Sequence, residues 1–210
     1  MDKSFWEFNK KFDITFLVEG EELYVHRYVL SSSSPVFKVL LESDNFVEKN
    51  KRVISLPNKN KENIQEMLNY IYPFGHQISD KTNIDCLLIL SREYQINKIH
   101  NLCEEFLLKK VPTFELLITA QEFQLKNLES KCIEYFSEKA LISLENHPKY
   151  NELSEDNKLQ LAERQNMTLQ AACDKARKCQ LHPMQMLWMI SSQLVKYILL
   201  TTFKHYMWQL

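Results

Sequence analysis

Two short, mainly apolar runs lie close together near the start of the chain. Residues 14–18 (ITFLV) form a β-branched and aromatic run of strand length, and residues 23–25 (LYV) form a second. Gly20 lies between them, and its tolerance of positive φ favours a tight turn. We therefore predict a β-hairpin, followed by a helix that opens at His26 and Arg27.

After the hairpin, apolar residues recur with the spacing of a helix. Ser34 and Pro35 suit the N-cap and first turn of a helix. One face of that helix carries Phe37, Leu40 and Leu41. Residues 53–56 (VISL) predict another short strand, and Asn60 can cap a second amphipathic helix. Strands and helices mixed in this way predict an α+β domain.

The middle of the chain contains an internal repeat. Residues 88–96 (LILSREYQI) align with residues 117–125 (LITAQEFQL) at an offset of 29 residues, 117 minus 88. The alignment continues to Cys103 and Cys132, which we expect to be small core residues. Each copy predicts a helix, a turn and a second helix, and we expect stacked copies to complete each other's core.

The remainder of the chain has a weaker pattern. Residues 153–156 (LSED) predict the start of a further helix, and the periodicity fades after about Asn166. Residues 184–210 are rich in Met, Trp and Leu, but polar residues and Lys196 disfavour a membrane span. A packed amphipathic helix is one interpretation, and a tail made by truncation or alternative splicing is another. These patterns divide the chain into residues 1–110, 111–166 and 167–210.

Composition excludes several classes of function. Lys and Arg number 26 and Asp and Glu number 27, so no global field favours nucleic acid or an anionic membrane. Only two glycines occur, whereas phosphate-binding loops need several, so a P-loop or Rossmann turn is excluded. No nucleophile and base share a useful spacing. We therefore predict no catalytic residues, no cofactor and no enzymatic activity.

The cysteines also argue against a metal site or a disulfide framework. The five cysteines are an odd number without framework spacing, and no signal peptide opens the chain, so we expect a cytoplasmic or nuclear protein. Cys173, Cys179 and His182 match no common zinc spacing, and the nearest fourth ligand is the distant His205. We predict no bound metal.

Residues 13–37 resemble the opening of a BTB/POZ domain. The features that carry this resemblance are the hairpin, the His26-Arg27 pair, the run of serines and the helix that starts with a proline. The resemblance extends from about Phe12 to Lys110 and is closest to the type joined to MATH domains and its invertebrate relatives. Residues 111–166 are similar to the BACK-type helical extension that often follows. The resemblance implies a small, mainly antiparallel sheet flanked by helices and continued by helical hairpins.

BTB domains bind other proteins, and the resemblance implies an adaptor that brings a substrate protein to a cullin-3 RING ubiquitin ligase. Domains of this kind carry an apolar residue followed two positions later by an acid, and Phe46-Val47-Glu48 fits that pattern. The expected cullin-contacting residues are Phe37, Leu40, Leu41, Phe46, Val47 and Glu48, with Tyr72 and Tyr94 at the rim. The substrate is not identified by the sequence.

The same resemblance implies a second site and other modes of action. Asp13, His26 and Arg27 would line a charged pocket, although two charges that fix the end of a strand are the simpler interpretation. The alternative to an adaptor is a homodimeric scaffold or transcription-regulator module that acts without ubiquitin chemistry. Homodimers, or heterodimers with other BTB proteins, follow from the family. A decoy that binds cullin without delivering a substrate is a further alternative.

Overall fold

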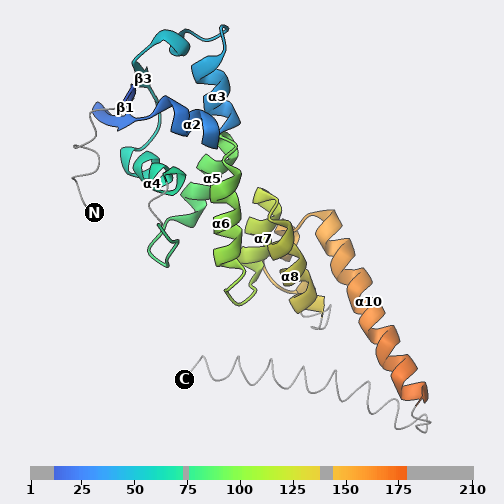
Figure 1. Ribbon diagram of the computed structural model, residues 1–210. Coiled ribbons are helices and arrows are strands. Elements are labelled where there is room, and N and C mark those ends of the chain that lie inside the picture. The colour runs from blue at the N-terminus through green and yellow to red at the C-terminus, as the bar shows by residue number, and fades with distance from the viewer. Residues whose placement is uncertain (1–11, 73–75, 138–143, 179–210) are drawn as a thin grey trace, which may run out of the picture. The chain divides into compact units, whose positions relative to one another are not determined.

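The computed structural model describes residues 12–72, 76–137 and 144–178, and the chain divides into two compact units, Met1–Lys109 and Lys110–Leu210 (Figure 1). The first unit combines a small sheet with helices, and the described residues of the second unit form helices and turns. This confirms the α+β class expected from the sequence.

The predicted hairpin is present. Strands β1 (Ile14–Val18) and β2 (Glu21–Val25) pair antiparallel over five residues. The two-residue turn places Glu19 at φ 54° and Gly20 at φ 81°. Positive φ at both positions is what a type I′ hairpin turn requires. The sequence marked only Gly20, because glutamate rarely adopts this conformation.

A third strand makes the sheet mixed. Strand β3 (Val53–Ser55) pairs in parallel with the other edge of β1, so the order is β2-β1-β3. The antiparallel pair is the longer of the two. Ile14, Phe16 and Val18 of β1 are buried, because every second side chain of a strand points to the same face.

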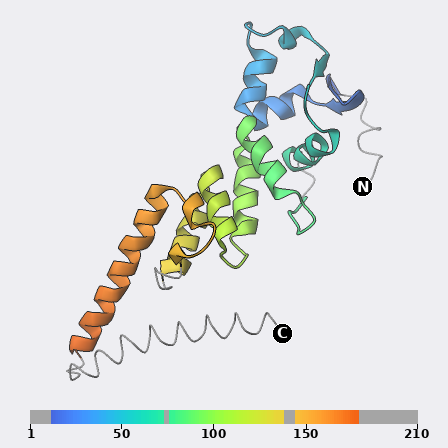
Figure 2. The ribbon, with the colours of Figure 1, turned by 180° about the vertical axis from the view of Figure 1, so that it is seen from behind.

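The described residues of the first unit also form five α-helices and one 3₁₀ helix. They are α2 (Arg27–Ser33), α3 (Pro35–Glu42), the 3₁₀ helix η1 (Val47–Asn50), α4 (Lys61–Ile71), α5 (Ile84–Glu93) and α6 (Asn97–Leu107). Both predicted N-caps are confirmed, because the side chain of Ser34 accepts from the N–H of Phe37 and that of Asn60 from the N–H of Asn63. Figures 1 and 2 show the segment with η1 as an extended excursion between α3 and β3.

The two helical hairpins predicted by the internal repeat are present, one in each unit. Helices α7 (Phe114–Phe123) and α8 (Lys126–Ser137) form the second hairpin, which corresponds to α5 and α6. Gln95 and Gln124 occupy the same position, 29 residues apart, at φ 53° and 57°. Cys103 and Cys132 are fully buried, as expected of core residues.

The second unit continues with η2 (Tyr150–Glu152) and α10 (Glu155–Lys178). Ser154 caps α10, since its Oγ accepts from the N–H of Asn157 at 3.2 Å, which confirms the predicted helix start. The helix runs past Asn166 to Lys178, so no element ends at the boundary expected near residue 166. In the part of the chain that is described, no helix is both long and apolar enough to cross a membrane.

Two other expectations fall outside these ranges. The helix expected within residues 184–210 and the zinc candidates Cys179, His182 and His205 lie outside the described residues, and the side chain of Cys173 is not described either.

Candidate protein-interaction surface

Helix α3 presents its apolar residues to two different environments. Phe37 and Leu41 are fully buried, and the ring of Phe37 stacks on Tyr94 with centroids 4.4 Å apart. They belong to the core, so the prediction that they contact a partner is wrong. Leu40 is half-buried, and Val39 is 52% exposed. The outward face of α3 is therefore centred on Val39.

The segment after α3 also exposes apolar side chains. Phe46 is 42% exposed and Val47 is 66% exposed, while Glu48 is partly buried. The backbone there is ordered by local hydrogen bonds: the N–H of Phe46 donates to Ser43 at 3.2 Å, and that of Lys49 donates to Phe46 at 3.3 Å. We call Val39, Leu40, Phe46, Val47 and Glu48 together the α3–β3 surface.

Charged groups of both signs border this surface. The ammonium of Lys49 lies 2.5 Å from a carboxylate oxygen of Asp44, and its hydrogen bond and charge lower the pKa of that carboxyl. Lys51 lies 3.6 Å from Glu48. An apolar centre with a charged rim is the usual anatomy of a protein interface.

Tyr72 and Tyr94 do not lie at the rim of this surface. Their exposed fractions are 4% and 6%, so the prediction that they contact a partner is also wrong. Burial raises the pKa of Tyr72 to about 12, and burial likewise raises the pKa of Tyr94. Both rings are internal supports whose hydroxyl groups stay protonated at neutral pH.

His26 is a structural residue in this arrangement. The hydroxyl of Tyr72 accepts the backbone N–H of His26 at 2.9 Å and lies 2.9 Å from Nδ1 of the same residue. Which of the two groups donates in the second contact depends on the ring nitrogen of His26 that carries the proton. The ring also lies 4.7 Å from that of Phe12. Both polar contacts of His26 are therefore satisfied within its own unit.

Asp13 and Arg27 do not pair with each other, although both were expected in one charged pocket. The carboxylate of Asp13 accepts the backbone N–H of Arg27 at 2.7 Å. The guanidinium of Arg27 points elsewhere and donates to the carbonyls of Leu41 at 2.7 Å and Lys51 at 3.1 Å. Each side chain therefore fixes backbone groups.

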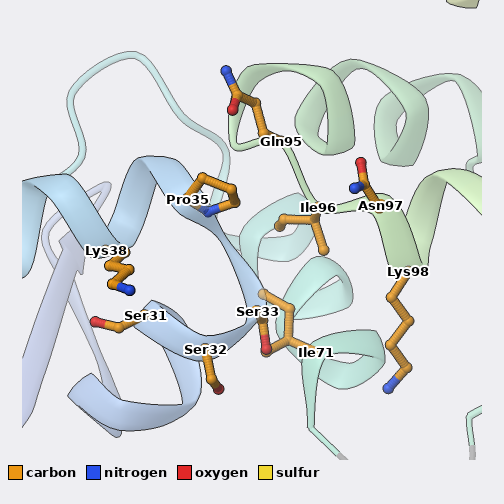
Figure 3. A pocket seen from close by; sticks show the side chains of 10 residues that line it. All are labelled: Ser31, Ser32, Ser33, Pro35, Lys38, Ile71, Gln95, Ile96, Asn97 and Lys98. Carbon is orange, nitrogen blue, oxygen red and sulfur yellow. The ribbon is translucent and has the colours of Figure 1, made fainter.

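A pocket of about 730 Å³ opens beside the first turn of α3 (Figure 3). It is lined by Ser31, Ser32, Ser33, Pro35, Lys38, Ile71, Gln95, Ile96, Asn97 and Lys98. Neither lysine has an ion pair among the described residues, and no acidic side chain lines the pocket. Its chemistry suits an acidic group rather than a cation. Within the described residues no three or more His, Cys, Asp or Glu gather in a way that could hold a metal ion.

Sequence reasoning missed Val39 and the contacts of Ser34. Val39 lies two positions from both Phe37 and Leu41, which is about 200° around a helix, so the helical period places it on the opposite face from these two residues. Ser34 both caps α3 and donates from Oγ to the carbonyl of Tyr94. That second bond spans 60 residues, and no local pattern signals it.

Several known proteins resemble the first half of the chain. Kelch-like protein 40 of Xenopus laevis is 31% identical over 109 residues, which is 52% of this chain and 17% of that protein. BTB and MATH domain-containing protein 38 of Caenorhabditis elegans is 34% identical over 95 residues, which is 45% of this chain and 24% of that protein. The chain therefore corresponds to a small part of these relatives.

Among solved structures, the BTB domain of human gigaxonin is similar at 21% identity and a TM-score of 0.40, over 49% of this chain and 84% of that one. The family model described as the BTB/POZ domain matches residues 3–111, just over half of the chain. The sheet and the helices within residues 3–111 thus have the fold of this family, and the chain belongs to the BTB/POZ family of protein-interaction domains.

Proposed function

We propose that this protein is a non-enzymatic adaptor that binds cullin-3 through the α3–β3 surface and brings a substrate protein to the ubiquitin ligase. The catalytic groups of such a ligase belong to other subunits. The exposed ring of Phe46, held in an ordered and otherwise charged segment, is the single observation that carries the proposal.

The physical argument concerns exposed apolar area. A phenylalanine ring left in water at a fixed position costs solubility unless a partner covers it. Phe46, Val47 and Val39 are all more than 40% exposed and come from α3 and the segment that follows it. Rigid aromatic anchors of this kind contribute most of the affinity at many interfaces, because they enter the partner without losing much conformational freedom.

Glu48 has a different role in this proposal. It follows Phe46 by two residues, starts the 3₁₀ helix η1 with Val47, and lies beside Lys51. A partly buried carboxylate next to an aromatic anchor sets the register and the charge preference of a partner more than the affinity itself.

The relatives are consistent with this proposal without testing it. The name of the Caenorhabditis elegans relative joins a BTB domain to a MATH domain, which is the type that the sequence of this chain resembles. We assign residues 111–166 to a BACK-like extension, which the hairpin of α7 and α8 and the start of α10 would form.

The test is a calorimetric titration of the complete chain with the N-terminal region of cullin-3. We expect Phe46→Ala to weaken binding by about 30-fold, equivalent to about 2 kcal/mol. We expect Glu48→Gln to weaken it by several-fold, because the shape remains and only the charge is lost.

Tyr28→Ala is the matched control. Tyr28 is an aromatic residue on α2 with an exposed fraction of 81%, and it lies outside the α3–β3 surface. Its removal should leave the affinity unchanged. Equal affinity of the native protein and the Phe46 variant would disprove the contact, and absence of binding by the native protein would disprove the adaptor function.

The alternative is a homodimeric scaffold or transcription regulator, whose distinguishing site would be the Asp13/Arg27 pocket and a dimer groove. Both of these side chains hydrogen-bond to backbone groups, so the pocket adds no support to this alternative. Light scattering of the purified chain tests dimer formation directly.

A further inference from the structure

The guanidinium of Arg27 joins the two ends of the segment that carries Phe46. Its Nη1 donates to the carbonyl of Leu41 in the last turn of α3, at 2.7 Å. Its Nη2 donates to the carbonyl of Lys51 just after η1, at 3.1 Å. Residues 42–50 lie between these two points.

The carbonyl of Leu41 would lack a hydrogen-bond donor without Arg27. The last four carbonyls of a helix lack partners within the helix. In α3 the N–H of Ser43 serves Val39, whereas among the described backbone groups no N–H serves Leu41. The last turn of α3 contains no basic residue, so Arg27 also supplies from α2 the positive charge that a helix C-terminus favours.

The other hydrogen bonds of the segment are local. They join Ser43 to Phe46, Phe46 to Lys49, and Glu48 to Lys51, and the Asp44–Lys49 ion pair also lies within the segment. None of them connects its start to its end. Arg27 makes that connection with two hydrogen bonds from one planar group.

Arg27 is itself held in place. The carboxylate of Asp13 accepts its backbone N–H, and this bond caps α2, because the side chain of His26 makes no capping bond. Asp13 therefore holds the backbone of Arg27, and the side chain of Arg27 in turn holds both ends of the segment that carries Phe46.

We infer that Arg27 is a positioning residue that presents Phe46, Val47 and Glu48 to a protein partner in one fixed arrangement. Without this connection the local turns of the segment open more often, and a partner must order them on binding. The affinity part of this inference rests on the proposed cullin-3 function, whereas the structural part does not.

The first measurement is amide hydrogen exchange on the complete chain. In Arg27→Met we expect the amides of Phe46, Lys49 and Lys51 to exchange at least about tenfold faster, with β1 and α4 unchanged. Exchange in Arg27→Lys should be intermediate, because an ammonium group lacks the planar geometry with which the guanidinium donates to both carbonyls. Arg52→Met is the control, since it removes the same charge from an exposed neighbour whose side chain makes none of these bonds.

The second measurement is the cullin-3 titration. We expect Arg27→Met to weaken binding about tenfold in the native background and by clearly less in a Phe46→Ala background, because only Val47 and Glu48 are then left to be positioned. Unchanged exchange at the three amides, or equally faster exchange throughout the unit, overturns the inference. If the native chain binds no cullin-3 while the exchange effect is present, the proposed function fails and the positioning role stands.

Discussion

One buried hydroxyl group connects the start of α2 to the end of α4. The hydroxyl of Tyr72 serves both the backbone N–H and Nδ1 of His26. We predict that Tyr72→Phe lowers the free energy of unfolding by about 1–3 kcal/mol, because it leaves two polar groups of His26 without this partner. Urea denaturation measures the change.

Tyr24→Phe is the control for that substitution. The hydroxyl of Tyr24 is bonded to the exposed carboxylate of Glu22, and water can replace that bond. A loss of stability in Tyr24→Phe as large as in Tyr72→Phe would contradict the structural role given to the internal hydroxyl.

The same burial predicts how stability depends on alkaline pH. Burial raises the pKa of Tyr72 from 10.0 to about 12 and that of Cys103 from 9.0 to about 12. The folded state therefore holds these protons at pH values where the unfolded state has released them. The stabilisation is complete below the unfolded pKa of each group and is lost as the pH rises through the folded pKa.

We accordingly expect the melting temperature to fall progressively between about pH 9 and pH 12. Thermal unfolding across this range measures it. Tyr72→Phe should make the decline above pH 10 shallower, and Cys103→Ala should do so from pH 9. A melting temperature that stays constant to pH 11 would show that these groups titrate equally in both states.

At the scale of elements, the first helix of each helical hairpin ends in the same backbone conformation. The N–H groups of Ile96 and Leu125 donate to the carbonyls of Ser91 and Ala120, and each hairpin has a glutamine at positive φ just before the donor. This left-handed ending of a helix is normally made by glycine, which has no Cβ to strain.

We predict that Gln95→Gly and Gln124→Gly each stabilise the protein by about 0.5–1 kcal/mol, because they remove that strain. Gln65→Gly is the matched control, since Gln65 lies inside α4 and the same change there should destabilise the protein by about 1 kcal/mol. Chemical denaturation of the three variants separates the two effects. Destabilisation by all three would show that the positive φ carries no cost.

The elements themselves were largely predictable from local patterns. Ser34, Asn60 and Ser154 each mark a helix start by the hydrogen-bonding chemistry of one side chain. The β-branched and aromatic run of residues 14–18 correctly indicated strand β1. The repeat was visible because two hairpins with the same contacts need the same residue types at the same spacing.

The details of the candidate surface were less predictable. An eight-residue helix offers only two turns, so the apolar residues of α3 did not by themselves show which face meets the core. The stacking of Phe37 on Tyr94 settles that question, and it joins residues that are distant in the sequence. The contacts of Arg27 were hidden for the same reason, since a guanidinium that serves two carbonyls leaves no spacing pattern.

At the scale of the whole molecule, the proposed binding residues lie within one unit. Val39 to Glu48, together with the supports at Asp13 and Arg27, belong to the unit Met1–Lys109. Residues that do not build this surface should therefore matter little for the proposed affinity for cullin-3.

This division predicts the effect of removing the last residues of the chain. A chain that ends at Lys178 retains α10 in full and all of the α3–β3 surface. We expect it to bind the N-terminal region of cullin-3 within about twofold of the complete chain, because every proposed contact and every support of the Phe46 segment is still present. Parallel calorimetric titrations measure the two affinities. Light scattering on the same samples shows whether the two proteins have the same number of chains per particle. A tenfold loss of affinity at unchanged assembly state would show that residues 179–210 contribute to the binding surface, and the set of contacts proposed here would then be incomplete.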